Sequence, residues 1–328
     1  MINTPRFIGS KRAYINGNYF VALNGYSRKW ETLRFGEKIF KPSFPDSLDV
    51  KLTNKCGVGC PFCHESSSPS GKSFDLDETK RVLSELPHKV PIELAFGGGD
   101  LLYEGDEDKI IDLLSWASDY GFNVAGTINM KSIYGKQLNN RQMGIFNLLE
   151  NLGVSIDSSK VLQDDEHLPD ILDDFGGYMR KNLTFHIILG IFPPKDLDEL
   201  LKGKYSWISD RLLILGYKSF GRGKSMNPMT PELLQEYKTV LKSFINGGYR
   251  GTGITVGFDN LAIEQLSLEN FIEDTIWENC YLGEEFTNSM YLDAVEQTYA
   301  PTSRSSERVS WKEMSLVEYF QKNHKEWT

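Results

Sequence analysis

The segment Cys56-Gly-Val-Gly-Cys60-Pro-Phe-Cys63 contains three of the four cysteines of this 328-residue chain. Their spacing is C-x-x-x-C-x-x-C, and three thiolates this close in sequence can converge on one face of an iron–sulfur cluster. Three ligands leave one iron of a cubane cluster open for a substrate or cofactor. Gly57 and Gly59 permit the unusual backbone angles of such a wrap, and Pro61 stiffens its return. The segment therefore predicts a curled metal-binding loop.

Zinc and disulfides are the two alternatives for these cysteines. Structural zinc sites have four ligands, usually in two separated pairs, and the nearest fourth ligand, His64, is directly adjacent to Cys63. Three local cysteines cannot pair evenly, and a chain of this length does not depend on disulfide crosslinks. We favour the cluster and keep one alternative, a non-catalytic zinc or iron–sulfur module that uses the same cysteines structurally.

The spacing of Cys56, Cys60 and Cys63, with the aromatic Phe62 before the last cysteine, resembles the signature of the radical S-adenosylmethionine (SAM) superfamily. The resemblance implies one [4Fe-4S] cluster on these cysteines, whose fourth iron binds the amino and carboxylate groups of SAM. It also implies reductive cleavage of SAM to methionine and a 5'-deoxyadenosyl radical, which abstracts hydrogen from a substrate. In that superfamily the backbone around the position of Phe62 contacts the adenine. An external flavodoxin- or ferredoxin-like protein is the expected electron donor.

The stretch from Phe96 to Asp100 is a second match to that superfamily. It resembles the Gly-Gly-Glu sequence that receives the SAM amino group, which implies a SAM-binding role for Gly97, Gly98, Gly99 and Asp100. Asp100 stands where the superfamily usually has glutamate, so its shorter side chain must be offset by the position of the backbone.

The composition predicts a protein of the cytoplasm. With 40% hydrophobic and 12% aromatic residues, the chain can bury a sizeable core as one large domain or two ordinary ones. A formal net charge of −9 argues against a broad nucleic-acid-binding surface, although a local basic patch is allowed. Residues 1–30 lack a positively charged start followed by an apolar core, and no apolar run approaches a membrane span. We therefore expect no membrane partner, and a compartment that keeps thiols reduced.

From Ser47 onward, β-prone and helix-prone segments alternate. The predicted strands are Leu48–Thr53, Ile92–Phe96, Phe122–Ile128, Val154–Ser158, Thr184–Gly190 and Arg211–Gly216. The predicted helices are Asp75–Leu86, Glu107–Asp119, Arg141–Glu150, Pro169–Arg180 and Leu197–Tyr205. Crossovers of this length demand parallel pairing. We predict an α/β fold with a partial (β/α)6 TIM-like barrel over residues 47–226, as the resemblance also implies, and both motifs at the C-terminal ends of its first two strands.

Two further regions flank this barrel. Residues 1–46 contain Asn-Gly pairs between β-prone runs, which predict a β meander that closes the end of the barrel or, alternatively, caps the substrate. Residues 227–328 predict an α+β region that packs on the barrel, with a helix at Pro231–Ile245 and β-prone stretches at Gly253–Phe258 and Met290–Asp293.

Polar residues at strand ends are the next candidates for the site. Thr127 and Asn129 end the third strand, and Ser155 and Asp157 lie on the fourth, which in the superfamily supplies a contact to the SAM ribose. His186 lies within the fifth strand, either as a proton shuttle or, as we favour, as a packing residue.

Two features near the barrel have open roles. Arg222 and Lys224, between glycines after the sixth strand, predict either a cradle for a carboxylate or phosphate or a solvated turn. Cys280 is either a hydrogen-atom donor to a substrate radical or, as we favour, a small core residue. A single extra cysteine cannot hold an auxiliary cluster, so we predict one cluster. The substrate stays open between a peptide side chain and a nucleotide or other small molecule.

Overall fold

The computed structural model describes residues 6–8, 11–24, 30–34, 41–134, 136–162, 182–226, 228–249, 251–274, 277, 281 and 283–325. The chain divides into two compact units. Unit 1 contains residues 1–55, 69–125 and 283–328, and unit 2 contains residues 56–68 and 126–282. These boundaries lie inside the predicted barrel, so the division at residues 46 and 226 stays a prediction. None of the described helices is both long and apolar enough to cross a membrane.

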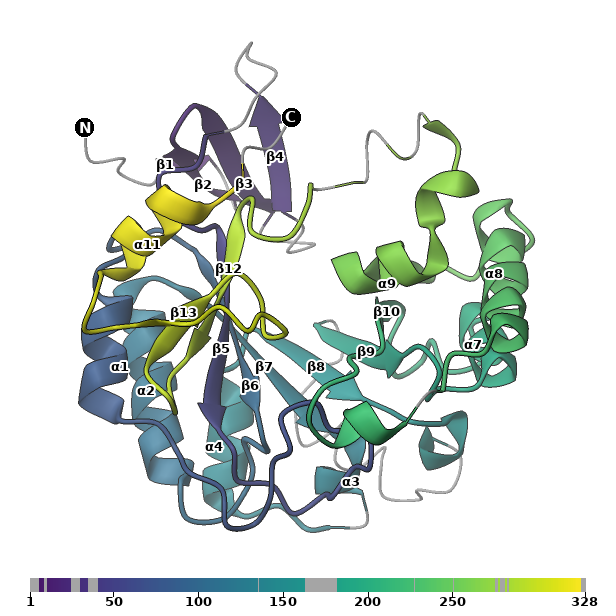
Figure 1. Ribbon diagram of the computed structural model, residues 1–328, viewed down its shortest axis with the longest axis horizontal. Coiled ribbons are helices and arrows are strands. Elements are labelled where there is room, and N and C mark those ends of the chain that lie inside the picture. Colours follow the sequence, from purple (N-terminus) through teal and green to yellow (C-terminus); the bar gives the residue numbers. More distant parts are fainter. Residues whose placement is uncertain are drawn as a thin grey trace. The chain divides into compact units, whose positions relative to one another are not determined.

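The N-terminal residues of unit 1 form the predicted meander (Figure 1). Its antiparallel strands follow chain order: β1 (Arg6–Ile8), β2 (Lys11–Asn16), β3 (Tyr19–Asn24) and β4 (Trp30–Arg34). The turn between β2 and β3 contains Gly17 at φ +58°, and a Cβ there would come within 1.6 Å of Lys41 O. This turn therefore requires glycine.

A buried polar cluster attaches this meander to residue 46, which precedes the first barrel strand. Tyr14 and Tyr19 each donate a hydroxyl hydrogen bond to the Asp46 carboxylate, at 2.8 and 2.6 Å, and Asn16 Nδ2 donates a third at 2.8 Å. Burial raises the pKa of Asp46, and the three donors partly offset that effect. Because buried carboxylates are stable only when hydrogen-bonded, the cluster fixes the meander to this position.

Ten of the described strands form one main sheet, in the order β11-β10-β9-β8-β7-β6-β5-β12-β13-β14. In unit 1, β5 (Ser47–Thr53) pairs in parallel with β6 (Glu93–Gly98) on one side and with β12 (Ser289–Asp293) on the other. The sheet continues through antiparallel β13 (Thr298–Ala300) and β14 (Val309–Ser310). The predicted β-prone stretch at 290–293 therefore extends the sheet beyond the first barrel strand.

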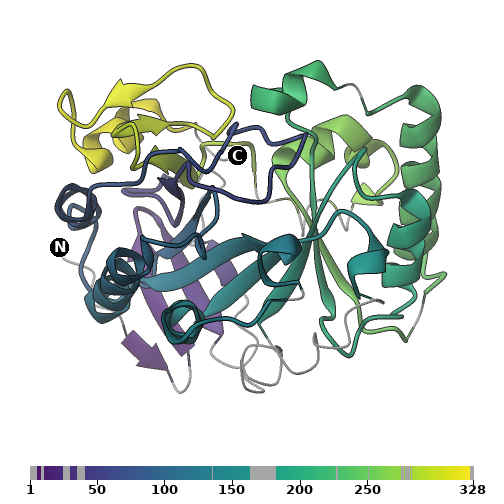
Figure 2. The same cartoon turned by 90° about the horizontal axis from the view of Figure 1, so that it is seen from below.

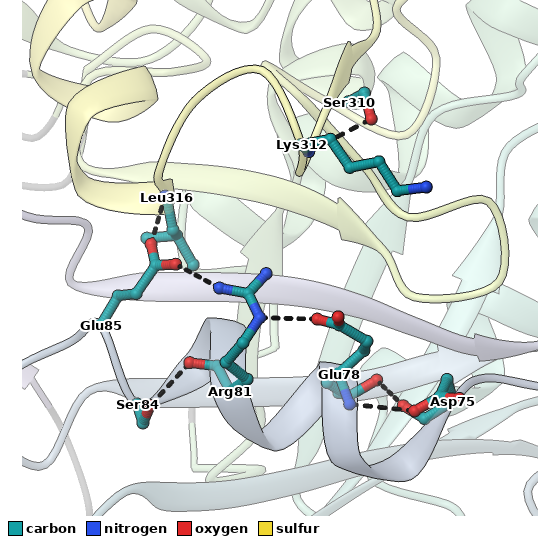
Figure 3. Close-up of polar contacts among 9 residues, drawn as sticks. Asp75, Glu78, Arg81, Ser84, Glu85, Ser310, Lys312 and Leu316 are labelled. Atoms are coloured by element: carbon teal, nitrogen blue, oxygen red, sulfur yellow. Dashed lines mark hydrogen bonds and ion pairs between the residues drawn. The ribbon is translucent and has the colours of Figure 1, made fainter.

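Two adjacent helices follow β5 and β6 (Figure 1): α1 (Leu76–Leu83) and α2 (Glu107–Tyr120). Figure 3 shows how α1 holds a later part of the chain. Arg81 bonds to both Glu78 and Glu85, at 2.6 and 3.2 Å, and Glu85 Oε2 accepts the Leu316 N–H at 2.5 Å. Leu316 begins α11 (Leu316–Asn323), so the Glu85 carboxylate lies at a helix N-terminus, where negative charge is favourable.

Unit 2 contains the remaining parallel strands of this order. The boundary between the units lies within β7 (Asn123–Asn129). Beyond it come β8 (Asn151–Ser155), β9 (Leu183–Ile188), β10 (Arg211–Leu215) and β11 (Thr255–Phe258). Strands β8 to β11 pair in parallel, each with the next. All six predicted barrel strands are present as β5 to β10, and β11 adds a seventh parallel strand that the sequence marked only as β-prone.

Three described helices of unit 2 lie close to predicted ones: α4 (Asn140–Leu148), α7 (Pro194–Leu201) and α8 (Pro231–Ile245). The sequence did not predict α3 (Met130–Ile133) or α9 (Asn260–Leu266). Helix α7 begins three residues before the prediction because Pro194 occupies its first turn, where a missing N–H costs nothing. Helices α7 and α8 lie side by side (Figure 2). The predicted helix at 169–180 lies outside the described residues.

Candidate active site

The cysteine loop of unit 2 closes on itself. Cys56 N donates to Ser68 O at 3.0 Å, Cys63 N donates to Cys60 O at 3.2 Å, and Ser66 N donates to Cys63 O at 3.3 Å. Cys56, Cys60 and Cys63 are not joined in disulfides, and each residue is half-exposed. The predicted curl of this segment is therefore confirmed, and its three thiols remain accessible.

Two side chains from the end of β7 and the start of α3 surround the middle cysteine. Asn129 Nδ2 lies 3.8 Å from Cys60 Sγ, within hydrogen-bonding distance for sulfur. Burial raises the pKa of the Cys60 thiol, and the ammonium of Lys131 partly offsets this by favouring the thiolate. Lys131 in turn forms an ion pair with Asp157, just beyond the end of β8. The predicted ribose ligand Asp157 thus already has a cationic partner beside this loop.

The glycine stretch after β6 packs against the backbone that precedes Cys56. Gly99 N donates to Thr53 O at 2.6 Å, and Asp100 N donates to Lys55 O at 2.8 Å. A Cβ on Gly99 would lie 2.2 Å from Lys55 O, so only glycine permits this approach. A Cβ on Gly97, in contrast, would meet nothing within 4 Å. The stretch therefore holds residue 55 directly before the cysteine loop, and it leaves open space beside Gly97.

Asp100 is turned toward its own loop. The residue is 8% exposed, and its Oδ1 accepts the Leu102 N–H at 3.0 Å. This bond orients the carboxylate. Its predicted contact with the SAM ammonium stays a prediction.

The strands of unit 2 carry a half-exposed polar face that includes two candidates. Ser155 on β8 lies opposite His186 on β9 in the strand register, and both are half-exposed. The His186 ring lies over Gly153, since a Cβ on that glycine would come within 2.2 Å of its Cε1. Although some of the residue's surface stays accessible, surrounding protein atoms desolvate the ring, and this burial lowers the pKa of His186 to about 4. At neutral pH the imidazole is therefore uncharged.

Curated proteins match parts of this chain, whereas no family model matches it. The PqqA peptide cyclase of Bradyrhizobium diazoefficiens is 34% identical over 82 residues, which is 24% of this chain and 20% of that protein. The probable GTP 3',8-cyclase of Methanocella arvoryzae is 29% identical over 83 residues, which is 25% of this chain and 27% of that protein. The matches thus span about a quarter or less of these relatives' lengths.

Two solved structures share the fold over most of this chain. Streptococcus suis SuiB, bound to its precursor peptide SuiA, superposes with a TM-score of 0.62 over 86% of this chain and 65% of SuiB, at 13% identity. The anSMEcpe structure with bound AdoMet and the Cp18Cys peptide gives a TM-score of 0.57 over 84% of this chain and 80% of that chain, also at 13% identity. At this level of identity, these likenesses show the fold.

The three-cysteine loop and this fold agree with the resemblance to the radical SAM superfamily.

The residues of this loop fit the [4Fe-4S] cluster that the resemblance implies. The closed loop carries three accessible thiols that form no disulfide, and an amide N–H from Asn129 points to one of them. Within the described residues, no three Cys, His, Asp or Glu side chains gather as ligands of a single metal ion. Because each thiolate of a [4Fe-4S] cluster binds a different iron, its ligands need not meet at one point. His64, the candidate fourth zinc ligand, has its Nε2 3.4 Å from Glu65 Oε1.

The structure also places the remaining candidate residues. Phe62 is half-exposed between Cys60 and Cys63, and Thr127 is half-exposed on β7. Lys224 is exposed, whereas Arg222 is half-exposed and donates side-chain hydrogen bonds to the cysteine loop. Cys280 lies outside the described residues.

Proposed function

We propose that this protein is a radical SAM enzyme that acts on a peptide. In this proposal Cys56, Cys60 and Cys63 hold one [4Fe-4S] cluster, and an external flavodoxin- or ferredoxin-like protein reduces it. The observation that carries the proposal is the closed loop with three half-exposed cysteines, none in a disulfide, in C-x-x-x-C-x-x-C spacing. When bound and reduced, the cluster supplies the electron that cleaves SAM into methionine and a 5'-deoxyadenosyl radical.

The residues around the loop have separate tasks in this proposal. Asn129 donates a hydrogen bond to the Cys60 sulfur, and such bonds to ligand sulfurs raise cluster reduction potentials. The open space at Gly97 receives the amino acid portion of SAM, with the carboxylate of Asp100 nearby in the same loop. Gly98 and Gly99 allow the close backbone approach to the residues before Cys56.

The polar face of unit 2 serves SAM and substrate. Ser155 supplies a hydroxyl for the ribose, and the ion-paired Asp157 is the second candidate at this strand end. His186 presents an uncharged imidazole that can accept or donate one hydrogen bond, and the described residues give its ring no hydrogen-bond partner. A ligand on this face would supply that partner.

Three of the proteins that this chain resembles support a peptide as the substrate. The superposed SuiB structure contains its precursor peptide, the anSMEcpe structure contains the Cp18Cys peptide, and one curated relative is a peptide cyclase. A nucleotide is the second candidate, because another relative carries the name GTP 3',8-cyclase.

Anaerobic reconstitution tests the enzyme class. We expect about four irons and four sulfides per chain, and dithionite-dependent release of 5'-deoxyadenosine from SAM. Alanine at Cys56, Cys60 or Cys63 should abolish both. Bound zinc without SAM cleavage would establish the non-catalytic module instead.

Deuterium transfer tests the substrate class. The reconstituted enzyme is incubated with SAM and a fully deuterated peptide extract, and 5'-deoxyadenosine is examined by mass spectrometry. Hydrogen abstraction from a peptide adds one mass unit to the product. A deuterated nucleotide extract is the matched control, and label arriving only from that extract would replace the peptide by a nucleotide. Cys280→Ala in the same assay should still cleave SAM, since we assign Cys280 no iron.

A further inference from the structure

The segment after β10 makes a concentrated contact with the cysteine loop inside unit 2. Here Arg222 lies in a short 3-10 helix, Gly221–Ser225. Its backbone N–H donates to Cys63 O at 3.0 Å and its Nε donates to Cys60 O at 3.0 Å. Its Nη1 donates to Ser67 O at 2.8 Å. One residue thus binds three carbonyl groups of the loop, two of which belong to cysteines.

The glycines on either side of Arg222 permit this contact. Gly221 has φ +53°, and a Cβ there would lie 2.4 Å from His64 O and 2.8 Å from Cys63 O. A Cβ on Gly223 would lie 3.0 Å from Phe62 O. Side chains at either position would therefore push the two backbones apart. The Gly-Arg-Gly sequence is explained by close packing on the loop, without any anion to bind.

The carbonyls that Arg222 binds determine where two thiols point. The direction of a Cα–Cβ bond follows from the orientation of its own backbone, so a fixed carbonyl at Cys60 and at Cys63 restricts both side chains. A guanidinium offers five N–H donors in a rigid plane, and its charge makes its hydrogen bonds shorter and stronger than neutral ones. Lysine at this position cannot span carbonyl groups in the same way.

We propose that Arg222 is a positioning residue that holds the backbone of residues 56–68 in the shape that ligates the cluster. This inference rests on the proposed function for its cluster part, but the order of the loop can be measured without any cluster. Arg222 therefore does not serve as the anion-binding side chain of the Phe220–Lys224 segment, and Lys224 is a cation of the same helix that makes none of these loop contacts.

Hydrogen exchange on the cluster-free protein tests the positioning role directly. In Arg222→Gln, amides of residues 56–68 should exchange about tenfold faster or more, because charge-assisted bonds that restrain the loop are lost. Exchange in α8 should not change. Arg222→Lys should behave like Arg222→Gln, since a single ammonium cannot replace a planar guanidinium that donates to two carbonyl groups at once. Lys224→Gln removes one positive charge two residues away and should exchange like the parent protein.

Iron release from the reconstituted protein tests the consequence for the cluster. With an excess of an iron chelator, Arg222→Gln and Arg222→Lys should lose iron several-fold faster than the parent, at unchanged melting temperatures, while Lys224→Gln should match the parent. If Arg222→Gln fails to fold, Arg222→Lys, which keeps the stem and the charge, provides the same comparison. Parental exchange, or faster exchange with unchanged iron release, would overturn the proposal. A parent protein that takes up no cluster would instead refute the proposed function, and the exchange experiment would still decide whether Arg222 orders the loop.

Discussion

The depressed pKa of His186 makes the stability of this protein dependent on pH. Burial over Gly153 lowers the pKa of His186 to about 4, against about 6.5 in the unfolded chain. Between these values the unfolded state binds more protons than the folded state, so acid favours unfolding. The contribution is fully present above pH 6.5 and is lost as the pH falls toward 4. We expect protonation of this histidine to lower the free energy of unfolding by about 2 kcal/mol between pH 8 and pH 5. The limit at still lower pH is about 3 kcal/mol.

His186→Gln isolates this contribution, since glutamine keeps a polar side chain and does not titrate. Urea unfolding of the cluster-free protein at pH 8 and pH 5 gives the loss of stability on acidification for each variant. We expect that loss to be smaller in His186→Gln by about 2 kcal/mol. His88→Gln removes an exposed histidine and controls for the loss of an imidazole as such. Equal losses in His186→Gln and the parent would refute the burial of this ring as the cause.

Two further sets of substitutions probe unit 1. Asp293→Ala removes the carboxylate that lies 3.1 Å from the buried Lys51 ammonium, and in urea titrations it should lower the free energy of unfolding by about 3–5 kcal/mol. The double variant Lys51→Met with Asp293→Leu leaves no unpaired charge and should regain most of that stability. Gly99→Ala places a methyl group 2.2 Å from Lys55 O and should cost about 1–3 kcal/mol, while Gly97→Ala, which meets nothing, should unfold like the parent. A Gly97→Ala protein of parental stability with weakened SAM binding, measured by equilibrium dialysis, would support a ligand beside Gly97, and unweakened binding would contradict it.

Local patterns predicted the main elements of this fold well. The apolar runs of β5 to β10 are separated by crossovers of helical length, and such runs are recognisable without knowledge of their neighbours. The cysteine spacing predicted the loop for the same reason, because its hydrogen bonds join residues close in sequence. The predicted fourth strand was placed three residues late. Gly153 and Asn151 lie within β8, and neither residue type favours a strand.

Contacts between distant residues could not be predicted in this way. Arg222 is separated from Cys60 by 162 residues, and nothing near Arg222 in sequence shows that a loop backbone lies against it. The same holds for His186, whose environment depends on Gly153 in the adjacent strand. Lys131 was not named as a site residue from the sequence. Its position directly after the polar end of the third strand was a weak indication that it lies near the cysteine loop. These side chains have roles that arise only when the strands are brought together.

The pairing of β12 with β5 has a consequence for synthesis and folding. Lys51 and Asp293 are 242 residues apart, so the first barrel strand obtains its second neighbour only after residue 293 has left the ribosome. Until then β5 presents an unpaired edge, which can pair wrongly with other chains. Contacts of such long separation also slow folding, because a large loop must close before they form. We therefore expect chains shortened before residue 289 to aggregate during expression, and chaperones that shield strand edges to matter most in this interval.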